Sequence, residues 1–493
     1  MFAVNSWTVR LVVLPLALLL GLLVLPAAQA AVEPGDSAIE ARWVALQGTP
    51  GDLGPELAAP NDKPRDVRNS QNVLLGRVQD FTAGSIFWST GTGAWDVRGA
   101  IRDRYLAAGG AGGTLGFPTA APETLASGGA QQVFTGGRIY WSDVTGAHAL
   151  QGAVLARYLA GATAALLKLP TTDETAVAGG SRTVFQGGEI YRSAVGARVV
   201  SGAILARYLA LGGSTGVLGM PTSEEVAAQV AGARVSVFAK GRIYWSAGTG
   251  ARAVYGGILA KYLAMSGERA YLGLPKSSVY AVRGGHRVSF IYGYITQLSG
   301  KSAVVTGYWR ASVRTITARE IPYTYRSGCP VGPASLRRVK MPYYDWAGVP
   351  RLGDLIVRTS AADDMQRVFK RAFGARFPIR QIRPVDVWKG SDIAAMAADN
   401  TSAFNCRKVT GNPYRLSQHS YGHAIDINTV ENPYVTATQV YPAGSRTYLN
   451  RRWVRKGMIV SSGPIAAGMR AEGWPWGARW SHPDYQHFSA NGG

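Results

Sequence analysis

Cysteine and histidine are rare in this chain of 493 residues, which has two cysteines, Cys329 and Cys406, and six histidines. Neither cysteine has a second one at metal-ligand spacing, and this excludes a cysteine-based zinc site. In an oxidising compartment an even pair indicates one disulfide, and two free buried thiols are the alternative. We therefore predict a bridge between Cys329 and Cys406.

Acidic residues are also few. The chain has 30 Asp and Glu against 52 Lys and Arg, which gives a net charge of +22. A surface this basic favours polyanionic partners. Charged residues make up only 17% of the chain and hydrophobic residues 47%, and this composition excludes a disordered protein. Nucleic acid would be the first partner to consider in the cytosol, but the N-terminus argues against that compartment.

Long hydrophobic runs are missing after the first thirty residues. Within those thirty, Arg10 precedes the apolar run 11–25, Pro26 follows it, and Ala28-Gln29-Ala30 supplies the small residues of a cleavage site. We predict a signal peptide at residues 1–30 and a secreted protein with no stable membrane span after cleavage. An uncleaved anchor is the alternative. The expected polyanions are then wall polymers and phospholipid headgroups, and we expect no nucleic-acid partner.

A sequence repeat with a period of about fifty residues occupies the first half of the chain. Each copy has a helix ending in Arg/Lys-Tyr-Leu-Ala, then a Leu-Gly-x-Pro turn, then a strand pair such as VFTGGRIYWS. The apolar spacing predicts one helix and one short hairpin per copy. Neighbouring copies must share a core, because so small a unit cannot bury both of its faces. We count five copies over about residues 36–300.

These units resemble the LGFP repeat of secreted bacterial cell-wall proteins, although Lys168 replaces the glycine of one turn. The resemblance implies that residues 31–300 bind cell-wall glycan, and we place a linker at 301–320. Three tryptophans are candidates for stacking on sugar rings, with a role in the core as the alternative: Trp88, Trp141 and Trp245.

Four of the six histidines lie within the last 75 residues. In LSQHSYGHAIDIN, His419 and Asp426 are seven residues apart, and in HPDYQHF, Asp484 and His487 are three apart. The segment HAIDIN is typical of a strand that points the Asp426 carboxylate away from its two isoleucines. Gly422 permits a tight turn that brings His419 to the same point.

Two imidazoles and one carboxylate form a three-ligand catalytic zinc site with the fourth position left for water. A second carboxylate, not bound to the metal, is then needed to move the proton of that water. We predict His419, Asp426 and His487 as zinc ligands and Asp484 as the acid–base residue. A helical pair of His419 with His423 would require a glutamate directly after the first histidine, and Ser420 stands there instead.

The pattern S-x-H-x-x-G-x-A-x-D followed by D-x-x-H resembles the D-alanyl-D-alanine carboxypeptidase and L-alanyl-D-glutamate endopeptidase family of zinc peptidases. It covers about residues 321–493, which we take as the peptidase domain. By this resemblance Arg407 is the catalytic arginine, which holds an oxyanion or a substrate carboxylate, and a surface arginine is the alternative. Ser417 is expected to contact substrate or ligand, and Trp480 to line the cleft or belong to the core.

The family implies an α+β fold with an antiparallel sheet. A helix is expected from Met365, and strands are expected at RQIRPVDVW and HAIDIN. We therefore predict a secreted, zinc-dependent peptidoglycan peptidase held at the cell wall by its repeats and acting on stem peptides. An inactive wall-binding scaffold and a peptidase of secreted proteins are the alternatives.

Overall fold

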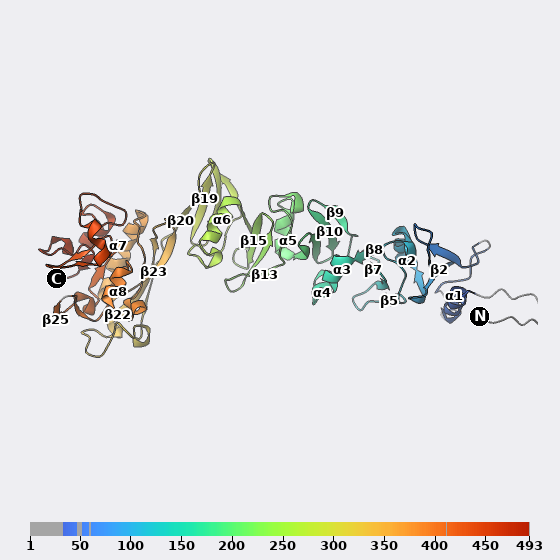
Figure 1. The fold of residues 1–493 in the computed structure, drawn as a ribbon, viewed down its shortest axis with the longest axis horizontal. Helices are drawn as coiled ribbons and strands as arrows, with labels where there is room; N and C mark the ends of the chain where they lie inside the picture. Colours follow the sequence, from blue (N-terminus) through green and yellow to red (C-terminus); the bar gives the residue numbers. More distant parts are fainter. Residues whose placement is uncertain (1–32, 47–51, 59–60, 411, 493) are drawn as a thin grey trace, which may run out of the picture. The chain divides into compact units, whose positions relative to one another are not determined.

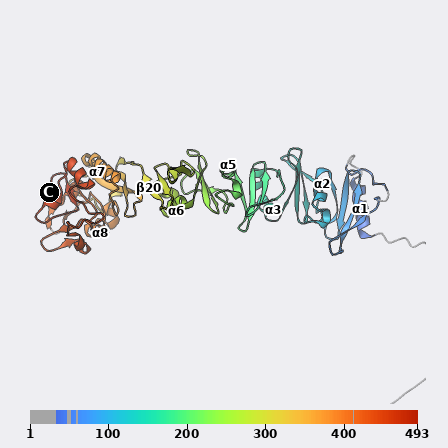
Figure 2. The same ribbon diagram turned by 90° about the horizontal axis from the view of Figure 1, so that it is seen from above.

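A computed structural model describes residues 33–46, 52–58, 61–410 and 412–492. The predicted signal peptide therefore lies outside the described residues. The chain divides into two compact units, residues 1–141 and 142–493, so the division falls inside the predicted repeat region. Figures 1 and 2 show the ribbon from two directions. None of the described helices has both the length and the hydrophobicity needed to cross a bilayer.

The repeat alternates one helix with a group of four short strands. The helices are α1 (Pro34–Leu46), α2 (Gly99–Ala107), α3 (Gly152–Leu159), α5 (Gly202–Leu209) and α6 (Gly256–Ala264). A short additional helix, α4 (Thr163–Leu167), follows α3.

The strands recur in five groups. They are β1 (Arg65–Arg68), β2 (Leu74–Phe81), β3 (Gly84–Ser89) and β4 (Gly93–Arg98); β5 (Glu123–Thr124), β6 (Ala130–Phe134), β7 (Gly137–Ser142) and β8 (Gly146–Gln151); β9 (Thr175–Val177), β10 (Gly180–Phe185), β11 (Gly188–Ser193) and β12 (Gly196–Ser201); β13 (Val226–Ala227), β14 (Ala233–Phe238), β15 (Gly241–Ser246) and β16 (Arg252–Tyr255); and β17 (Tyr280–Val282), β18 (Gly285–Phe290), β19 (Gly293–Leu298) and β20 (Val304–Gly307).

The prediction of one hairpin per copy therefore gave too few strands, because each copy has four strands and not two. The hairpin is present, but a short strand precedes it and a fourth strand follows it, as in β9–β12 and β17–β20. The outer strands pair with backbone groups that a lone hairpin would leave open along both edges. They are short or lack a strong alternation of apolar residues, and for this reason the pattern did not reveal them.

The repeated tyrosine joins the helix to the turn of its own copy. Its hydroxyl donates to the carbonyl oxygen at the glycine position of the turn: Tyr105 to Gly116 at 2.6 Å, Tyr158 to Lys168 at 2.8 Å, Tyr208 to Gly219 at 3.0 Å and Tyr262 to Gly273 at 2.8 Å. All four rings are buried. The recurring tyrosines are thus core residues that fix the helix against the turn.

The recurring tryptophans are half-buried rather than freely exposed. Trp88 packs at the edge of the cluster around Phe81, and Trp245 at the edge of the cluster around Phe238. The indoles of Trp88 and Trp245 therefore pack partly against the core. Only the remaining part of each ring is accessible to a sugar.

Lys168 occupies a backbone conformation that suits glycine. Its φ is 58° and its ψ is −144°, while Gly116, Gly219 and Gly273 hold φ values of 66° to 68° at the matching turns. We expect Lys168→Gly to raise the free energy of unfolding by about 1–2 kcal/mol, because it relieves this strain. Urea unfolding of the two proteins measures the difference.

The reverse change provides the control. A Cβ at Gly273 would meet its nearest atom, in Tyr292, only at 3.5 Å, so Gly273→Lys adds the backbone strain without a clash at Cβ. It is expected to destabilise by a similar amount. A loss of stability in Lys168→Gly would show that the lysine side chain matters more than its backbone conformation.

The C-terminal part is an α+β structure with an antiparallel sheet, and α7 lies beside that sheet in Figure 1. The sheet contains β21 (Ser312–Thr315), β22 (Leu336–Tyr344) and β23 (Pro350–Arg358). The helix expected from Met365 is α7 (Ala362–Gly374), and it packs on β22 and on α9 (Pro464–Ala471). The remaining elements are α8 (Asp392–Ala397), β24 (Lys408–Val409), β25 (Asn412–Leu416), β26 (Ala424–Asp426), β27 (Tyr434–Val435), β28 (Val440–Tyr441) and β29 (His487–Ser489).

The expected strand at RQIRPVDVW was wrong. Residues 380–384 form no strand and make one isolated bridge, between Ile382 and Thr401, and a 3₁₀ turn follows at Val385–Trp388. Pro384 has no N–H to donate to a ladder, and its fixed φ suits the start of a helical turn.

Two strands lie within the predicted linker at 301–320. β20 completes the last sheet of the repeats, and β21 belongs to the sheet of the C-terminal part. The Tyr344 hydroxyl accepts a hydrogen bond from the Gly307 N–H at 3.1 Å, and Arg376 donates to the Val305 carbonyl at 2.7 Å. The last copy is therefore hydrogen-bonded to β22 and to the end of α7.

Candidate metal centre

A two-stranded ladder places one aspartate opposite one histidine. β26 pairs antiparallel with β29, and in this register Asp426 faces His487. Ile425 and Ile427 are fully buried in the main core, so the carboxylate between them points to the other side, as period-two alternation requires. The apolar face of β26 thus fixes the direction of Asp426.

A tight turn brings His419 to the same place. His419 lies in a 3₁₀ turn, Gln418–Tyr421. The Ser417 hydroxyl caps the start of this turn by accepting from the His419 N–H at 3.3 Å. Gly422 then reverses the chain with φ 67°. A Cβ at that position would lie 2.7 Å from the Arg358 backbone nitrogen, so only glycine fits between the turn and β26.

The three side chains form one compact group. His419 Nε2 lies 3.1 Å from Asp426 Oδ2, and His487 Nδ1 lies 3.0 Å from Asp426 Oδ1. The two imidazole nitrogens are 3.3 Å apart. All three residues are buried, and their facing atoms lie within 4.8 Å of one another.

The donor set fits a metal ion such as Zn²⁺. The Nδ1 of His419 lies 2.5 Å from the Ala403 carbonyl oxygen, and an N–H donated there leaves Nε2 as a lone-pair donor that faces the group. Two imidazoles and one carboxylate are ligands that zinc accepts, with one position left open. Among the described residues this is the one group of three or more such side chains that could hold a metal.

The two aspartates of the site differ in their acid strength. Burial alone would raise the pKa of Asp426, but the neighbouring imidazoles of His419 and His487 outweigh it and lower that pKa below its usual value. Burial raises the pKa of Asp484 to about 7, and the charge of Asp426 adds to the rise. Among the described residues, Asp484 Oδ1 is buried without a hydrogen-bond partner. Asp484 is thus a carboxyl group whose pKa suits proton transfer near neutral pH.

Arg407 reaches the same cleft and is held by a residue that the sequence did not single out. Its Nη2 lies 2.8 Å from Asp392 Oδ2, and its Nη1 donates to the Lys408 carbonyl at 3.0 Å. The Thr410 hydroxyl donates to the same Asp392 oxygen at 2.9 Å. In the described part of the chain, the buried Arg407 Nε has no partner. Arg407 is therefore fixed by an ion pair and is not a loose surface arginine.

The sequence carried only a weak signal for Asp392. It follows Ser391, whose side chain caps the start of α8, and an acidic residue in the first turn of a helix is a common stabilising feature. Nothing in the local pattern indicated that this carboxylate would meet an arginine fifteen residues further along the chain. Only the fold brings the two together.

One cleft with a volume of about 290 Å³ is lined by the candidate metal ligands, both neighbouring charged groups and the acid–base residue: His419, Asp426, His487, Asp392, Arg407 and Asp484. Ser417 and Trp480 are part of its wall, and the Trp480 ring centroid lies 5.4 Å from that of His487. Its other lining residues are Met396, Val409, Thr410, Arg415, Leu416, Gln418, Tyr434, Ser481, His482 and Gln486. His423 points elsewhere, because its Nε2 bonds the Ser360 hydroxyl at 2.9 Å.

Cys329 and Cys406 form a disulfide whose Cα atoms are 6.0 Å apart. It joins the loop before β22 to the segment that carries Arg407. The Thr324 carbonyl accepts the Cys406 N–H at 3.0 Å, and Arg326 donates to the Cys406 carbonyl at 2.7 Å. The backbone beside Arg407 is thus held by one covalent bond and two hydrogen bonds.

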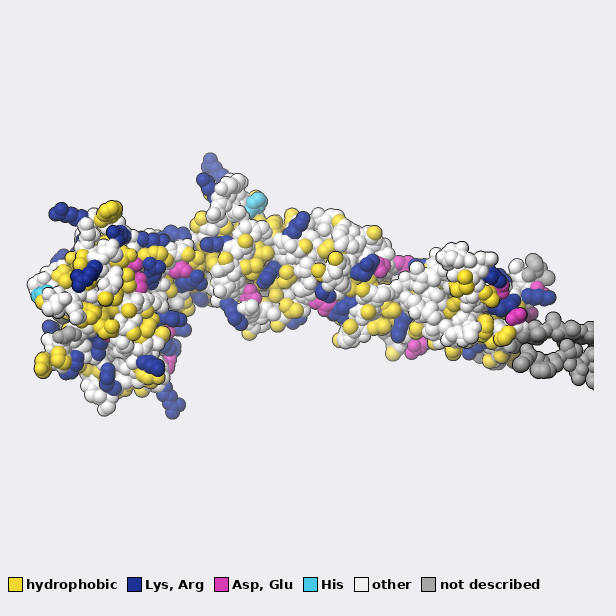
Figure 3. All heavy atoms as spheres, viewed as in Figure 1, with side chains coloured by type: hydrophobic (Ala, Val, Ile, Leu, Met, Phe, Trp, Pro, Cys, Tyr) yellow, Lys and Arg dark blue, Asp and Glu magenta, His cyan; other side chains and the backbone are white. Residues whose placement is uncertain are grey.

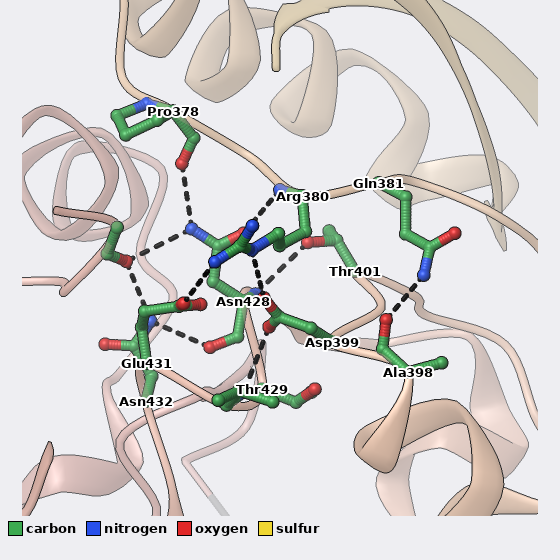
Figure 4. Close-up of polar contacts among 12 residues, drawn as sticks. Pro378, Arg380, Gln381, Ala398, Asp399, Thr401, Asn428, Thr429, Glu431 and Asn432 are labelled. Carbon is green, nitrogen blue, oxygen red and sulfur yellow. Dashed lines mark hydrogen bonds and ion pairs between the residues drawn. The ribbon is translucent and has the colours of Figure 1, made fainter. Parts of the chain in front are cut away.

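A buried polar network supports the chain just after β26 (Figure 4). Asn428 has a φ of 46°, accepts from the Arg380 N–H at 3.1 Å and donates to the Pro378 carbonyl at 2.9 Å. The Arg380 guanidinium lies between two carboxylates, 3.0 Å from Asp399 and 3.4 Å from Glu431. The network fixes the point at which the chain leaves the candidate metal-binding group.

Glu431 is expected to make the protein less stable at high pH. Burial raises its pKa to about 8, and the Asp399 carboxylate beside it contributes. Because its pKa is higher in the folded chain, the folded state holds a proton that the unfolded state has lost, so stability falls as pH rises from about 4.5 to 8. Glu431→Gln should remove this fall, and urea unfolding at pH 5 and pH 9 with chelator present measures it. The exposed Glu40→Gln is the control, and equal pH slopes in Glu431→Gln and the parent would contradict the prediction.

The fold and the cleft define an α+β domain with a candidate metal-binding group. Comparison with known proteins gives one match in this part of the chain: residues 410–490 match the family described as D-alanyl-D-alanine carboxypeptidase. The matched range contains His419, Asp426, Asp484 and His487 and begins after Arg407. No protein among the curated sequences compared with the chain matches it.

The first half matches the LGFP repeat over residues 71–113, 115–163, 167–216 and 218–269. Both resemblances expected from the sequence are thereby confirmed. Each match runs from strands into the following helix, whereas we counted each copy from helix to strands. The fifth group of strands, β17–β20, therefore follows the last match.

Proposed function

We propose that this protein is a secreted, zinc-dependent peptidase of peptidoglycan that is held at the cell wall by its repeats. The observation that carries the proposal is the convergence of His419, Asp426 and His487 in one cleft with the buried Asp484 carboxylate, whose Oδ1 has no hydrogen-bond partner among the described residues. The match to the carboxypeptidase family supports the peptidase activity, and the LGFP matches support the attachment to the cell wall.

In this proposal four side chains of the cleft carry the chemistry. His419, Asp426 and His487 would hold the ion, and Zn²⁺ bound there supplies a Lewis acid for the scissile carbonyl and a water of lowered pKa. Asp484 takes the proton of the attacking water and passes it to the leaving amine, a transfer that its raised pKa favours near neutral pH.

The remaining wall of the cleft orients the substrate. Arg407 provides a fixed positive charge for a substrate carboxylate or for the developing oxyanion. Ser417 and Trp480 line the same cleft and would contact a bound peptide. The tryptophans of the repeats are half-buried, and their exposed parts would be available for contact with wall glycan.

Mass spectrometry of purified muropeptides incubated with the protein tests the proposal. Loss of a terminal D-Ala would identify a carboxypeptidase, and cleavage between L-Ala and D-Glu would identify an endopeptidase. Either product should disappear with chelator and return when Zn²⁺ is added. If a zinc-loaded protein leaves every muropeptide intact, the scaffold alternative replaces the enzyme. Casein as a substrate tests the alternative of a general peptidase.

Asp392→Asn is expected to lower kcat/KM by about 10- to 100-fold, because a charge-assisted hydrogen bond contributes about 1.5–3 kcal/mol. The variant loses the carboxylate charge that fixes Arg407 in the cleft. Steady-state kinetics on the cleaved muropeptide measure the effect. A rise in KM alone assigns Arg407 to substrate binding, and an equal fall in kcat and kcat/KM assigns it to the oxyanion. Thr410→Val, which removes only the hydroxyl bond to Asp392, should have a smaller effect, and unchanged kinetics in Asp392→Asn would reject this role.

A further inference from the structure

A basic loop outside the cleft exposes two large apolar side chains. Between Arg446 and Lys456 the sequence RTYLNRRWVRK contains five Lys and Arg and no acidic residue. At its tip Trp453 is 70% exposed and Val454 is 56% exposed. We call residues 446–456 the tip loop.

The base of the tip loop is fixed to the domain. Arg451 is half-buried and donates to the Glu431 carbonyl at 2.9 Å, to Asn432 Oδ1 at 3.0 Å and to the Ile459 carbonyl at 2.6 Å. Directly after the loop, Gly457 has a φ of 83°, and a Cβ there would lie 2.1 Å from the Trp346 ring. Contacts of Arg451 and Gly457 with the folded structure therefore fix the loop in a position that leaves its tip exposed.

The four other cations of the loop are exposed: Arg446, Arg452, Arg455 and Lys456. The Arg455 guanidinium lies 5.9 Å from the centre of the Trp453 ring and 5.6 Å from the centre of the Tyr448 ring. The tip thus presents an apolar pair surrounded by positive charge, with no carboxylate of its own to neutralise it.

An anionic lipid surface fits this combination of groups. Each Lys or Arg near such a surface contributes about 1 kcal/mol, and tryptophan prefers the boundary between headgroups and acyl chains, where its ring is apolar on one side and wet on the other. An anionic wall polymer would use the cations but would leave Trp453 and Val454 without a role. The apolar pair is what favours the bilayer.

We propose that the tip loop, residues 446–456, docks the C-terminal part on the surface of a bilayer that contains anionic phospholipid. Trp453 and Val454 enter the headgroup region, and Arg446, Arg452, Arg455 and Lys456 pair with lipid phosphates. This contact is peripheral and does not depend on the peptidase activity. Arg451 also links the loop to the cleft, since its guanidinium lies 4.5 Å from the ring of Tyr485, the neighbour of Asp484.

Sedimentation with vesicles tests the proposal on residues 31–493, which contain all that the structure describes. Phosphatidylcholine vesicles with phosphatidylglycerol are compared with phosphatidylcholine alone. We expect binding to the anionic vesicles, and we expect Trp453→Ala with Val454→Ala to weaken it about ten-fold or more. Replacing the four exposed cations of the loop by Gln should weaken it by at least the same factor.

The control must separate this loop from the general charge of the protein, because Lys and Arg side chains are spread widely over the face shown in Figure 3. Lys301, Lys340, Lys370 and Lys389 are exposed, and changing these four to Gln alters the net charge equally. This variant should bind within about two-fold of the parent. Equal losses in both quadruple variants would overturn the proposal.

A second arm distinguishes lipid from polymer. Soluble polyphosphate serves as an anionic chain that has no apolar phase. If the Trp453 and Val454 double variant binds vesicles as well as the parent does, and polyphosphate competes fully, the loop recognises anionic polymer and the bilayer proposal is wrong. Activity on muropeptides is expected to be unchanged in the double variant, which shows that the cleft remains folded.

Discussion

Asp484→Asn is expected to reduce peptidase activity by about 10³-fold while the protein keeps its zinc. General acid–base catalysis by a positioned side chain contributes about 10²- to 10⁴-fold, and the amide can neither take nor return a proton in this step. Because Asp484 is not assigned as a metal ligand, zinc content measured by atomic absorption should stay near that of the parent. Activity is measured as the rate of muropeptide cleavage.

The same substitution is expected to stabilise the metal-free protein. Burial and the charge of Asp426 raise the pKa of Asp484 to about 7, so the folded state holds a proton that the unfolded state loses near pH 4. Stability from this group therefore falls as pH rises from about 4 to 7, and the amide removes the fall. The gain in melting temperature should be larger at pH 8 than at pH 5, with chelator present.

Asp143→Asn, at an exposed position, provides the control of equal charge and should change neither property. Two results would reject the role of Asp484. One is full activity in Asp484→Asn, and the other is loss of zinc together with activity, which would make Asp484 a ligand instead.

His487→Ala is expected to abolish both zinc binding and activity. The imidazole is one of three donors in the group, and its Nδ1 lies 3.0 Å from Asp426 Oδ1. Two remaining donors cannot hold the ion at physiological zinc, and the loss of several kcal/mol of transition-state stabilisation lowers the rate by at least about 10³-fold. Metal analysis after gel filtration and the muropeptide assay measure the two effects.

His423→Ala is the matched control, because this imidazole is four residues from His419 in sequence yet bonds Ser360 instead of the group. It should keep both metal and activity. Zinc retained at the level of the parent in His487→Ala would place the metal elsewhere. Zinc lost in His423→Ala would revive the helical histidine pair rejected on sequence.

The spacing of residues along the sequence was sufficient to predict the repeat and the candidate residues of the site. Tyr105 and its counterparts recur because each copy needs the same bond between helix and turn, and recurrence of this kind is visible in a sequence. His419, Gly422 and Asp426 lie within eight residues, so turn and strand propensities alone bring them close. The outer strands of each copy were not found, because they are short or lack a strong alternation of apolar residues, and backbone pairing leaves little trace in the side-chain pattern.

Contacts between distant segments were beyond the reach of local pattern. The sequence named His487 as a partner of Asp426, but the ladder of β26 with β29 sets them in register across sixty-one residues. It gave no reason to pair Asp392 with Arg407, because an acidic residue at a helix start has an adequate local explanation. RQIRPVDVW was predicted to be a strand, yet residues 380–384 make only one isolated bridge and a 3₁₀ turn follows Pro384.

The residue types, their order and their short-range spacing therefore indicate the repeat, the candidate site residues and the two family resemblances. Burial, charge environment and long-range register depend on the folded chain, because each arises from groups that are far apart in sequence. The raised pKa of Asp484 arises from burial and from a carboxylate fifty-eight residues away. The exposure of Trp453 likewise follows from where Arg451 and Gly457 anchor the loop on the folded domain.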